Sequence, residues 1–521
     1  MLPHLQIPPR APRRFARAPV LALLAAAAAA AQAQSEGGAG ATATPRALSI
    51  VPTFSATMTL TDNVNLSADN RRADLITQVS PGIAVTSNTR RIKGFLNYSV
   101  SGIVYARESS SNEIQHALNA VARIEAIEDW AFIDLTGSVS QELISAFGTQ
   151  SRDSSAANSN RTQVANYSVS PYVRGRFGDV ANYDARLTYS GSSSGASSAY
   201  NAATYEARAR VGGATALRAV GWDVEGSRQA FENDSTGSSH SDRLRGVLSY
   251  TVNPELQVSV NAGRETENVS GVASQSYNTH GWGFSWIPIE RTRVSVAREK
   301  RFFGNSHNYL VEHRTPRTVW RYNDSRNLSS GFSQFRISGQ GTAYDLFFAQ
   351  FASIEPDPVA RAIRVTEFLR ANGIPPNTVV LSGSLASATL VQRQQEFSFA
   401  WLGVRDTLTV SVSRSQGERA DRVIVVNDDF ANGNRLTQSG VSASLGHRLT
   451  PDSALSLTAT AQRATGTTDN RTSRLDTVAL TWSGRFGART SGSVGARHQR
   501  SGGSATHYTE SALIAVISMQ F

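Results

Sequence analysis

An alternation of apolar and polar side chains with a period of two residues constrains this chain more than any other feature. It is clearest in the final stretch, His507 to Phe521. Because successive side chains of a strand project to opposite faces, this stretch predicts a strand with one apolar face. That face carries Ser511, Leu513, Ala515, Ile517, Met519 and Phe521, and the other carries Glu510, Ala512, Ile514, Val516, Ser518 and Gln520.

The same unit of about ten alternating residues and a turn recurs from Ser49 onward. Short turns alternate with longer polar links, which is typical of the periplasmic turns and external loops of a membrane barrel. Trp282, Phe284 and Trp286 form an aromatic face of the kind found at a membrane interface. We therefore predict an all-β, transmembrane antiparallel β-barrel of the bacterial outer membrane. Its strand number should be even, about 22 and within roughly 18 to 24.

The end of the sequence resembles the C-terminal assembly signal of outer-membrane barrels, with Ile517, Met519 and Phe521 as its apolar positions. This resemblance implies the barrel assembly machinery as a partner. The alternative is a soluble β-sandwich whose last strand ends in phenylalanine.

Composition narrows the alternatives. The hydrophobic fraction is 40% and the mean hydropathy is -0.27, which excludes a bundle of membrane helices. Cysteine is absent, so disulfides and thiolate metal sites are excluded. The net charge of +10 is almost entirely arginine, since Lys93 and Lys300 are the only lysines. These arginines are scattered along the strands and form no basic stripe with stacking aromatics, which disfavours nucleic-acid binding.

The N-terminus carries an export signal. Four arginines between Arg10 and Arg17 precede an apolar run that ends at the cleavage motif Ala31-Gln32-Ala33. Residues 1–33 are therefore predicted to be a secretory signal peptide, residues 34–48 a flexible leader and residues 49–521 the barrel.

One insertion, residues 339–390, interrupts the alternation. Asp357 is a suitable N-cap, Pro358 a suitable first helical residue, and Asn372-Gly373 a suitable stop, so a helix is predicted over 358–371. By parity it belongs to an external loop. Either it folds inward and narrows the pore, presenting Arg361 and Arg364, or it caps the loop.

A set of arginines on the polar faces of strands is predicted to line the lumen. They either cross-link the barrel wall through partners such as Glu206 and Glu225, or form a ladder that attracts acidic polymer. The set is Arg174, Arg176, Arg208, Arg210, Arg243, Arg245, Arg291 and Arg293.

Other polar clusters give no defensible catalytic, cofactor or metal site, so a non-enzymatic protein is predicted. His307 and His313 have no clear third ligand, and girdle histidines are the simpler interpretation. Asp421, Asp428 and Asp429 form either a cation site or, more simply, a solvated loop cluster. Between Arg298 and Asn327 charged residues blur the alternation, and the register is predicted to shift there at a bulge.

Three stretches resemble a known family. They are His313 to Thr318 with Trp320, the segments Asp357 to Asn377 and Arg393 to Arg405, and Tyr167 to Phe177. Together they resemble the outer-membrane proteins associated with the PEP-CTERM/exosortase system of Gram-negative bacteria. This resemblance implies a barrel connected with exopolysaccharide and biofilm production, and it assigns no catalytic residues.

Two functions follow as hypotheses. The first is a porin-like channel or exporter for exopolysaccharide, and the second is a non-conducting scaffold barrel of an envelope assembly. A soluble propeller or sandwich enzyme is a more distant third. The expected partners are outer-membrane lipid and lipopolysaccharide, acidic exopolysaccharide and envelope export proteins.

Overall fold

The computed structural model describes residues 47–521 except 197–200, 218, 236, 270–273, 330–343, 345–346, 349–350, 352–354, 356, 372–382, 422–427, 432, 468–469 and 505–506. The predicted signal peptide (1–33) and nearly all of the predicted leader (34–48) lie outside these residues. No helix in the described part is long and apolar enough to span a membrane.

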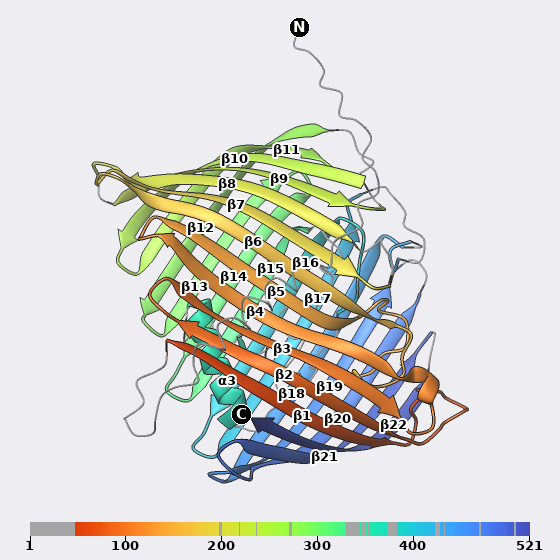
Figure 1. The fold of residues 1–521 in the computed structure, drawn as a ribbon. Coiled ribbons are helices and arrows are strands. Elements are labelled where there is room, and N and C mark those ends of the chain that lie inside the picture. The colour runs from red at the N-terminus through yellow and green to blue at the C-terminus, as the bar shows by residue number, and fades with distance from the viewer. Residues whose placement is uncertain are drawn as a thin grey trace, which may run out of the picture.

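Twenty-two strands, one α-helix and one 3-10 turn make up the described structure (Figure 1). They are β1 (Leu48–Thr61), β2 (Asp74–Asn88), β3 (Ile92–Tyr105), η2 (Ser109–Ser111), β4 (Glu113–Ile127), β5 (Ala131–Leu143), β6 (Arg161–Phe177), β7 (Ala181–Ser194), β8 (Ala202–Ala214), β9 (Val220–Asn233), β10 (Gly237–Asn253), β11 (Leu256–Asn268), β12 (Gln275–Ile289), β13 (Thr292–Arg301), β14 (Gly304–Arg314), β15 (Thr318–Ser329), α3 (Pro358–Ala371), β16 (Leu390–Leu402), β17 (Asp406–Arg419), β18 (Arg435–Thr450), β19 (Ser453–Gly466), β20 (Thr472–Arg485), β21 (Thr490–Gly503) and β22 (Tyr508–Gln520).

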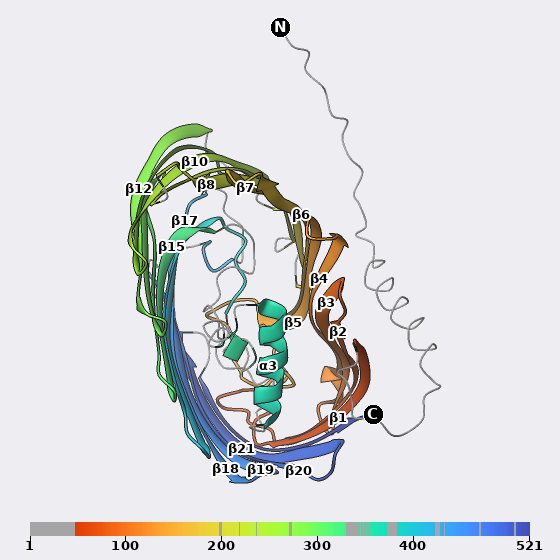
Figure 2. The ribbon, with the colours of Figure 1, turned by 90° about the vertical axis from the view of Figure 1, so that its left-hand side faces the viewer.

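Each strand pairs antiparallel with the next along the chain, and the last pairs with the first. In the closing pair Thr53 lies opposite Gln520 and Thr61 opposite Ala512. The sheet therefore has no free edge and forms a closed barrel, seen from another side in Figure 2. The predicted fold class and the predicted strand number are confirmed.

The two-residue alternation separates an apolar outer face from a polar inner face. Met58, Leu248 and Leu480 on the outer face are 54%, 56% and 45% exposed, because no described part of the chain covers them. The predicted aromatic residues Trp282 and Trp286 lie on the same face. An apolar outer belt on a closed ring of strands satisfies the backbone polar groups and suits the hydrocarbon of a membrane.

The longest connections, such as 62–73, 144–160 and 420–434, all lie at one end of the barrel. Short turns such as 178–180 and 254–255 join strands at the end where the chain enters β1 and leaves β22. Gly178 has φ of +55° in the β6–β7 turn, a conformation that glycine adopts without steric cost. Barrels of this form carry short turns on the periplasmic side, so the long loops are extracellular.

The predicted register shift between Arg298 and Asn327 is wrong. Pairing of β13 with β14 runs unbroken from Thr292–His313 to Arg301–Gly304. The strands β13, β14 and β15 have 10, 11 and 12 residues, and their alternation looks irregular because charged residues lie on their outer face. Charged residues near their extracellular ends, such as Arg298 and His307, occupy the outer face in register with Trp282.

The protein is a β-barrel of the bacterial outer membrane. Its closed ring, its apolar outer belt and its two-sided arrangement of turns and loops are the observations that place it there.

The outer belt makes a stability prediction. Leu248→Arg places a charge in the belt and should lower the free energy of unfolding by ~2–4 kcal/mol. Ser249→Arg, the next residue on the inner face, should change it by less than about 1 kcal/mol because its charge stays in water. Equilibrium denaturation in lipid vesicles measures both, and equal losses in the two variants would contradict the assignment of faces.

Candidate functional site

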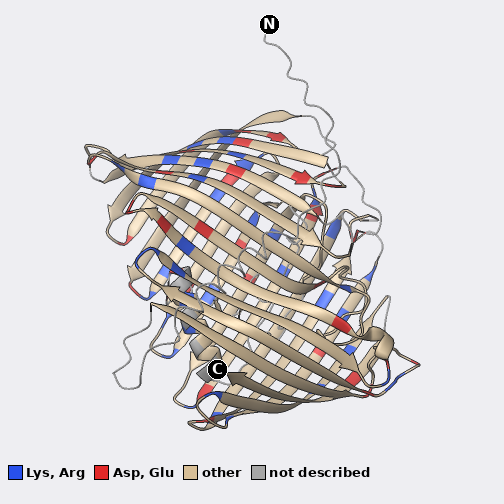
Figure 3. Cartoon of the chain, viewed as in Figure 1, with Lys and Arg blue, Asp and Glu red and all other residues tan. Residues whose placement is uncertain are grey.

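The lumen is the part of the molecule where chemistry-bearing side chains gather. Charged residues concentrate on the strands from β4 to β14, while β1 to β3 are nearly free of them (Figure 3). Their inner faces carry linked ion pairs. Arg123 of β4 and Arg186 of β7 both bind Asp134 of β5, at 2.9 and 3.1 Å.

The predicted lumen arginines on β8 and β10 lie on the inner face and are paired. Arg208 binds Glu225, and Arg210 binds Asp223, across the β8–β9 pair. Arg243 and Arg245 of β10 both approach Glu299 of β13, at 2.5 and 3.7 Å.

The remaining arginines of the set have different surroundings. Arg174 lies over the Phe132 ring, 4.5 Å from its centroid, and Arg176 donates to Asn182 at 3.1 Å. Arg293 lies on β13 directly opposite Glu312 of β14. Arg291 is in the periplasmic turn before β13, so it is on no strand face and the structure does not place it with the others.

Water reaches one arc of the inner wall. The side chains of Arg208 and Arg210 are 44% and 57% exposed. On the arc from β16 to β21 the inner face instead carries covered hydroxyl and amide groups, such as those of Ser411, Gln438 and Gln499. The lumen is therefore wet along the arc that carries Arg208 and Arg210, and filled along the arc from β16 to β21.

Extracellular loops that turn inward cover the arc from β16 to β21. Phe147 of loop 144–160 and Phe430 of loop 420–434 belong to one buried apolar cluster with Ala386 and Ala388. The segment before β16 also reaches the end of β5, where Leu385 donates its N–H to the Leu143 carbonyl at 3.0 Å. Three extracellular segments thus pack on one another within the barrel.

Buried aspartates hold these loops together. Asp428 accepts hydrogen bonds from the Ser387 N–H at 2.7 Å, from the Ser387 hydroxyl, and from the Phe430 N–H at 2.9 Å. Asp429 accepts from the Ala146 N–H at 2.7 Å and from the Ser145 hydroxyl at 2.5 Å.

Asp421 has the same role, because it accepts from the Thr389 N–H at 2.5 Å and from Arg419 at 2.7 Å. The prediction of a solvated cluster or cation site at Asp421, Asp428 and Asp429 is therefore wrong. These residues are 5%, 3% and 7% exposed and bind backbone N–H groups of other loops. Among the described residues no group of three or more His, Asp or Glu side chains is arranged to hold a metal ion.

Burial shifts the acidity of this cluster. Burial, opposed by hydrogen bonds from Ser145 and Ala146, raises the pKa of Asp429 to about 6. Burial also raises the pKa of Asp421 above its usual range. Removing a carboxylate from water disfavours its charged form, so both groups bind a proton more readily in the packed loops than in open ones.

A second anchor fixes loop 144–160 to the strands that close the barrel. Arg497 of β21 binds Asp153 at 2.8 Å and Glu510 of β22 at 2.9 Å, and all three are largely buried. Burial would raise the pKa of Asp153, but Arg497 and Ser155 hold it below its usual range. The hydroxyl of Tyr105 adds a bond to the Ser155 carbonyl at 2.6 Å.

The helix α3 covers the predicted range 358–371 and lies inside the ring of strands (Figure 2). Val365 and Leu369 pack on Phe347, and Tyr344 from the preceding segment contacts Phe95 of β3 with ring centroids 6.3 Å apart. Of the two interpretations of this insertion, the inward fold matches the position of α3.

The two predicted plug arginines are held within the insertion. Arg361 donates to the Glu355 carbonyl at 2.8 Å and lies over Phe348, and Arg364 is 3.6 Å from the Glu355 carboxylate. Burial and the nearby Arg321 of β15 lower the pKa of Arg361. A constricting role for Arg361 and Arg364 stays a prediction.

The two histidines are separate. His307 contacts Asp324 at 2.9 Å on the outer face, and His313 contacts the Thr292 hydroxyl at 2.8 Å. Neither belongs to a three-residue metal cluster in the described part of the chain.

Sequence reasoning missed the inward loops. Loop 144–160 reads as an ordinary polar link, rich in Ser and Asn, yet many of its polar groups bind within the loop or bind other segments. The apolar Ala146-Phe147 and the adjacent pair Asp428-Asp429 are the signals that could have indicated burial.

Comparison with known proteins gives structural similarity alone. No protein-family model matches the sequence, and no curated protein matches it. The fold is similar to a variant of the ferric enterobactin receptor PfeA of Pseudomonas aeruginosa, with 10% identity, 91% of this chain and 80% of that chain covered, and a TM-score of 0.44.

Two further barrels are similar to the same degree. The FrpB iron transporter of Neisseria meningitidis has 9% identity, with 90% and 82% of the two chains covered and a TM-score of 0.46. The siderophore receptor PirA of Acinetobacter baumannii has 9% identity, with 91% and 80% covered and a TM-score of 0.45. Similarity this low extends to the arrangement of strands and gives no information on what this chain binds.

Asp428→Ala tests the loop packing. It leaves the buried N–H groups of Ser387 and Phe430 without their acceptor, which should destabilise the packed loops by ~2–5 kcal/mol. Amide hydrogen exchange at these two residues should accelerate while strand amides stay protected. Asp406→Ala, which removes an exposed carboxylate of β17 beside His447, is the control and should leave the loops unchanged. Unaltered exchange at Ser387 would contradict the role of Asp428.

The acidity of Asp429 predicts a pH dependence. The pKa of Asp429 is about 6 in the folded protein and 3.8 ordinarily, so binding of a proton to Asp429 stabilises the packed loops. This stabilisation is fully present below pH 3.8 and is lost as the pH rises through 6. Lowering the pH from 7 to 5 should stabilise the packed loops by ~1 kcal/mol, roughly tenfold in the opening equilibrium. The raised pKa of Asp421 changes loop stability with pH in the same direction. The pKa of Asp153 is lowered, so its protonation affects loop stability only at pH values below this range.

Hydrogen exchange at Ala146, corrected for the intrinsic rate at each pH, measures this change. Asp429→Asn cannot titrate and should remove most of it. The same pH dependence in wild type and in Asp429→Asn would show that another group is responsible.

Proposed function

We propose that this barrel is an outer-membrane channel or exporter for hydrophilic, anionic solutes, narrowed by its own inward loops. The observation that supports this most directly is the water-exposed arc of inner-wall arginines on β8, exemplified by Arg208 and Arg210. A hydrated wall rich in guanidinium groups is the surface that a passing anion would need.

The charges of this arc favour anions. Asp134 is shared by Arg123 and Arg186, and Glu299 by Arg243 and Arg245. Each of these groups therefore has two guanidinium groups for one shared carboxylate. Guanidinium groups of this kind pair well with carboxylate and phosphate.

Two arginines on β6 add to this excess. Arg174 contacts an aromatic ring and Arg176 an amide, and neither forms an ion pair with another described residue. Both lie on the inner face near the periplasmic end of the strand. They are therefore available to an anion that enters from the periplasm.

For the substrate we propose an acidic exopolysaccharide. The support is the resemblance of the sequence to the PEP-CTERM/exosortase-associated barrels together with the exposed arginines of the wall. A polysaccharide with carboxylates would slide along a guanidinium-rich arc by exchanging one pair for the next, as charged rings do in selective pores.

The inward loops give this channel a closed form. Loops 144–160 and 420–434 are packed on segment 383–389 through Asp428 and Asp429. Passage of a polymer requires these loops to move, and a partner or the polymer itself would have to favour the open arrangement.

The second candidate is a non-conducting scaffold. The ion pairs that cross-link the wall and the buried loop cluster favour it, since both stiffen a barrel without a passage. The two candidates differ in conductance.

Planar bilayers distinguish the candidates. The wild type should conduct weakly, and Asp428→Ala with Asp429→Ala should raise conductance several-fold by releasing the loops. Under a salt gradient the open form should prefer anions, and Arg174→Gln with Arg176→Gln should reduce that preference. Arg489→Gln, in the periplasmic turn before β21, is the charge-changing control.

Absence of conductance in both the wild type and the loop variant would leave the scaffold as the remaining candidate. The substrate class is tested separately, because deletion of the gene should retain polymer inside the cell. Normal export of exopolysaccharide after deletion would overturn the proposed substrate while leaving a channel intact.

A further inference from the structure

The outer face of the barrel carries arginines in addition to its apolar belt. Arg414 of β17 lies opposite Ser439 of β18, and Ser439 lies opposite Arg463 of β19. Arg463 in turn lies opposite Arg474 of β20, so the three arginines form one row across the wall. Val412, two positions from Arg414 on the same face of β17, is 43% exposed. These arginines therefore point toward lipid and away from the lumen.

Further outer-face arginines extend this row around the wall. Arg228 of β9 lies opposite Ala207, Arg264 of β11 opposite Leu244, and Arg298 of β13 opposite Trp282. We call the following set the outer arginine belt: Arg228, Arg264, Arg298, Arg414, Arg463 and Arg474.

The outer arginine belt belongs to the extracellular half of the wall. Arg474 comes just after β20 begins, below an extracellular loop, and Arg463 comes shortly before β19 ends. Near the periplasmic rim the outer face carries exposed apolar residues, with Trp286, Ile289 and Phe486 at 43%, 55% and 65%. The belt therefore lies at the level of the outer leaflet.

Nearby carboxylates do not neutralise the belt. Asp242 is 3.6 Å from Arg228, and Asp476 is 2.7 Å from Arg474. The other four members form no ion pair with the described part of the chain. Arginine near a hydrocarbon boundary is costly unless an anion meets it.

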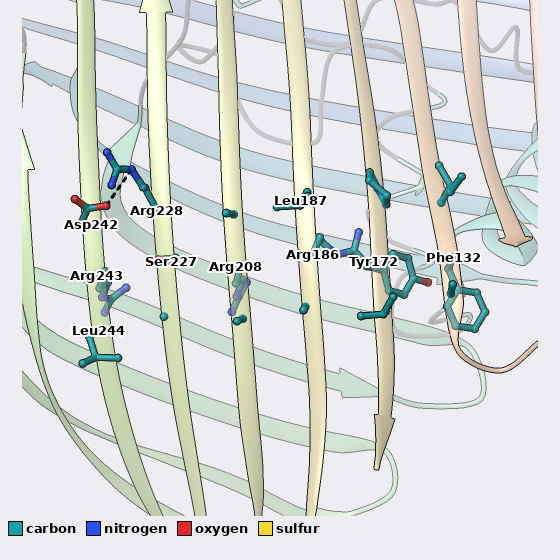
Figure 4. A pocket seen from close by; sticks show the side chains of 18 of the residues that line it. Phe132, Tyr172, Arg186, Leu187, Arg208, Ser227, Arg228, Asp242, Arg243 and Leu244 are labelled. Carbon is teal, nitrogen blue, oxygen red and sulfur yellow. Dashed lines mark ion pairs between the residues drawn. The ribbon is translucent and has the colours of Figure 1, made fainter. Parts of the chain in front are cut away.

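An apolar groove runs from one end of this belt down the outer wall (Figure 4). Its volume is about 1070 Å³. Its floor is made of small residues of β7, β8 and β9. Ala185 lies opposite Ala209, and Ala209 lies opposite Gly226. Ala207 lies on the same face of β8 as Ala209. A Cβ added at Gly226 would meet only Leu244, at 4.0 Å, so the glycine leaves open space.

Charges close one end of the groove. Arg228 and Asp242, which Figure 4 shows as an ion pair, stand beside Leu244, and Arg264 completes that end. The Arg228 side chain is 72% exposed, so its guanidinium remains available despite the partner at 3.6 Å. Exposed guanidinium groups at one end of an apolar groove suit an amphiphile with an anionic headgroup.

We propose that this site binds a phosphorylated glycolipid of the outer leaflet, with phosphate on Arg228 and Arg264 and one acyl chain in the groove. Guanidinium groups bind phosphate bidentately, and basic pockets on membrane proteins take lipid phosphates in this way. The position in the outward half of an outer-membrane barrel favours the glycolipid over a phospholipid. The site is on the opposite side of the wall from the lumen, so it stands independently of the proposed channel.

Lipid binding to the purified barrel tests the site. Bisphosphorylated lipid A, its dephosphorylated form and phosphatidylglycerol are compared by native mass spectrometry in detergent. The wild type should retain bisphosphorylated lipid A, and Arg228→Gln with Arg264→Gln should weaken retention by about tenfold or more through loss of two charge-assisted contacts. Arg489→Gln, at the periplasmic rim, is the control and should bind as the wild type does.

Gly226→Leu tests the acyl seat, because its side chain fills the groove without removing a charge. It should weaken lipid A retention while the protein keeps the heat-dependent gel mobility of a folded barrel. Equal retention of dephosphorylated lipid A or of phosphatidylglycerol by the wild type would overturn the glycolipid assignment. Unchanged binding in the double arginine variant would overturn the site itself, whatever the conductance measurements show.

Discussion

Closure of the hydrogen-bonded ring is the constraint on which the rest of this structure depends. Backbone N–H and C=O groups find no partners in hydrocarbon, so a sheet that crosses a membrane has to return to its first strand. The pairing of β1 with β22 does this, and Phe521 extends it by donating its N–H to the Pro52 carbonyl at 3.0 Å. Once the ring is closed, the two-residue alternation assigns each side chain to lipid or lumen without further choice.

The lumen created by that closure is wide, and the chain fills part of it with its own loops. Polar loops can pack inside a barrel only if their backbone groups find partners. Asp421, Asp428 and Asp429 supply carboxylates that accept hydrogen bonds from those N–H groups. The same burial that makes these carboxylates structural also raises the pKa of Asp421 and Asp429. Loop packing and proton binding are therefore linked in this protein.

The outer wall is not uniform around the ring. From β13 to β15 the strands are short, and polar groups lie on the lipid side close to their extracellular ends. Asp324 on that face is bound by Arg393 at 2.6 Å, by His307 at 2.9 Å and by Gln395 at 3.1 Å. Such a satisfied network lowers the cost of a buried carboxylate. Most members of the outer arginine belt form no such contacts with the residues that the structure describes, so an external anion is the partner that we propose for them.

The sequence by itself determined the architecture, because the side-chain alternation along a strand such as β22 is a local property of the linear order. It also placed Arg208 and Arg243 on the inner face and the helix at 358–371, since strand parity and helix caps are equally local. Only the tertiary structure decided what the loops do. Asp428 binds Ser387, and Asp153 binds Arg497, across long separations in the chain. Those contacts depend on which loops share the lumen and on how the closed ring brings distant strands together, and a local pattern of residues contains neither.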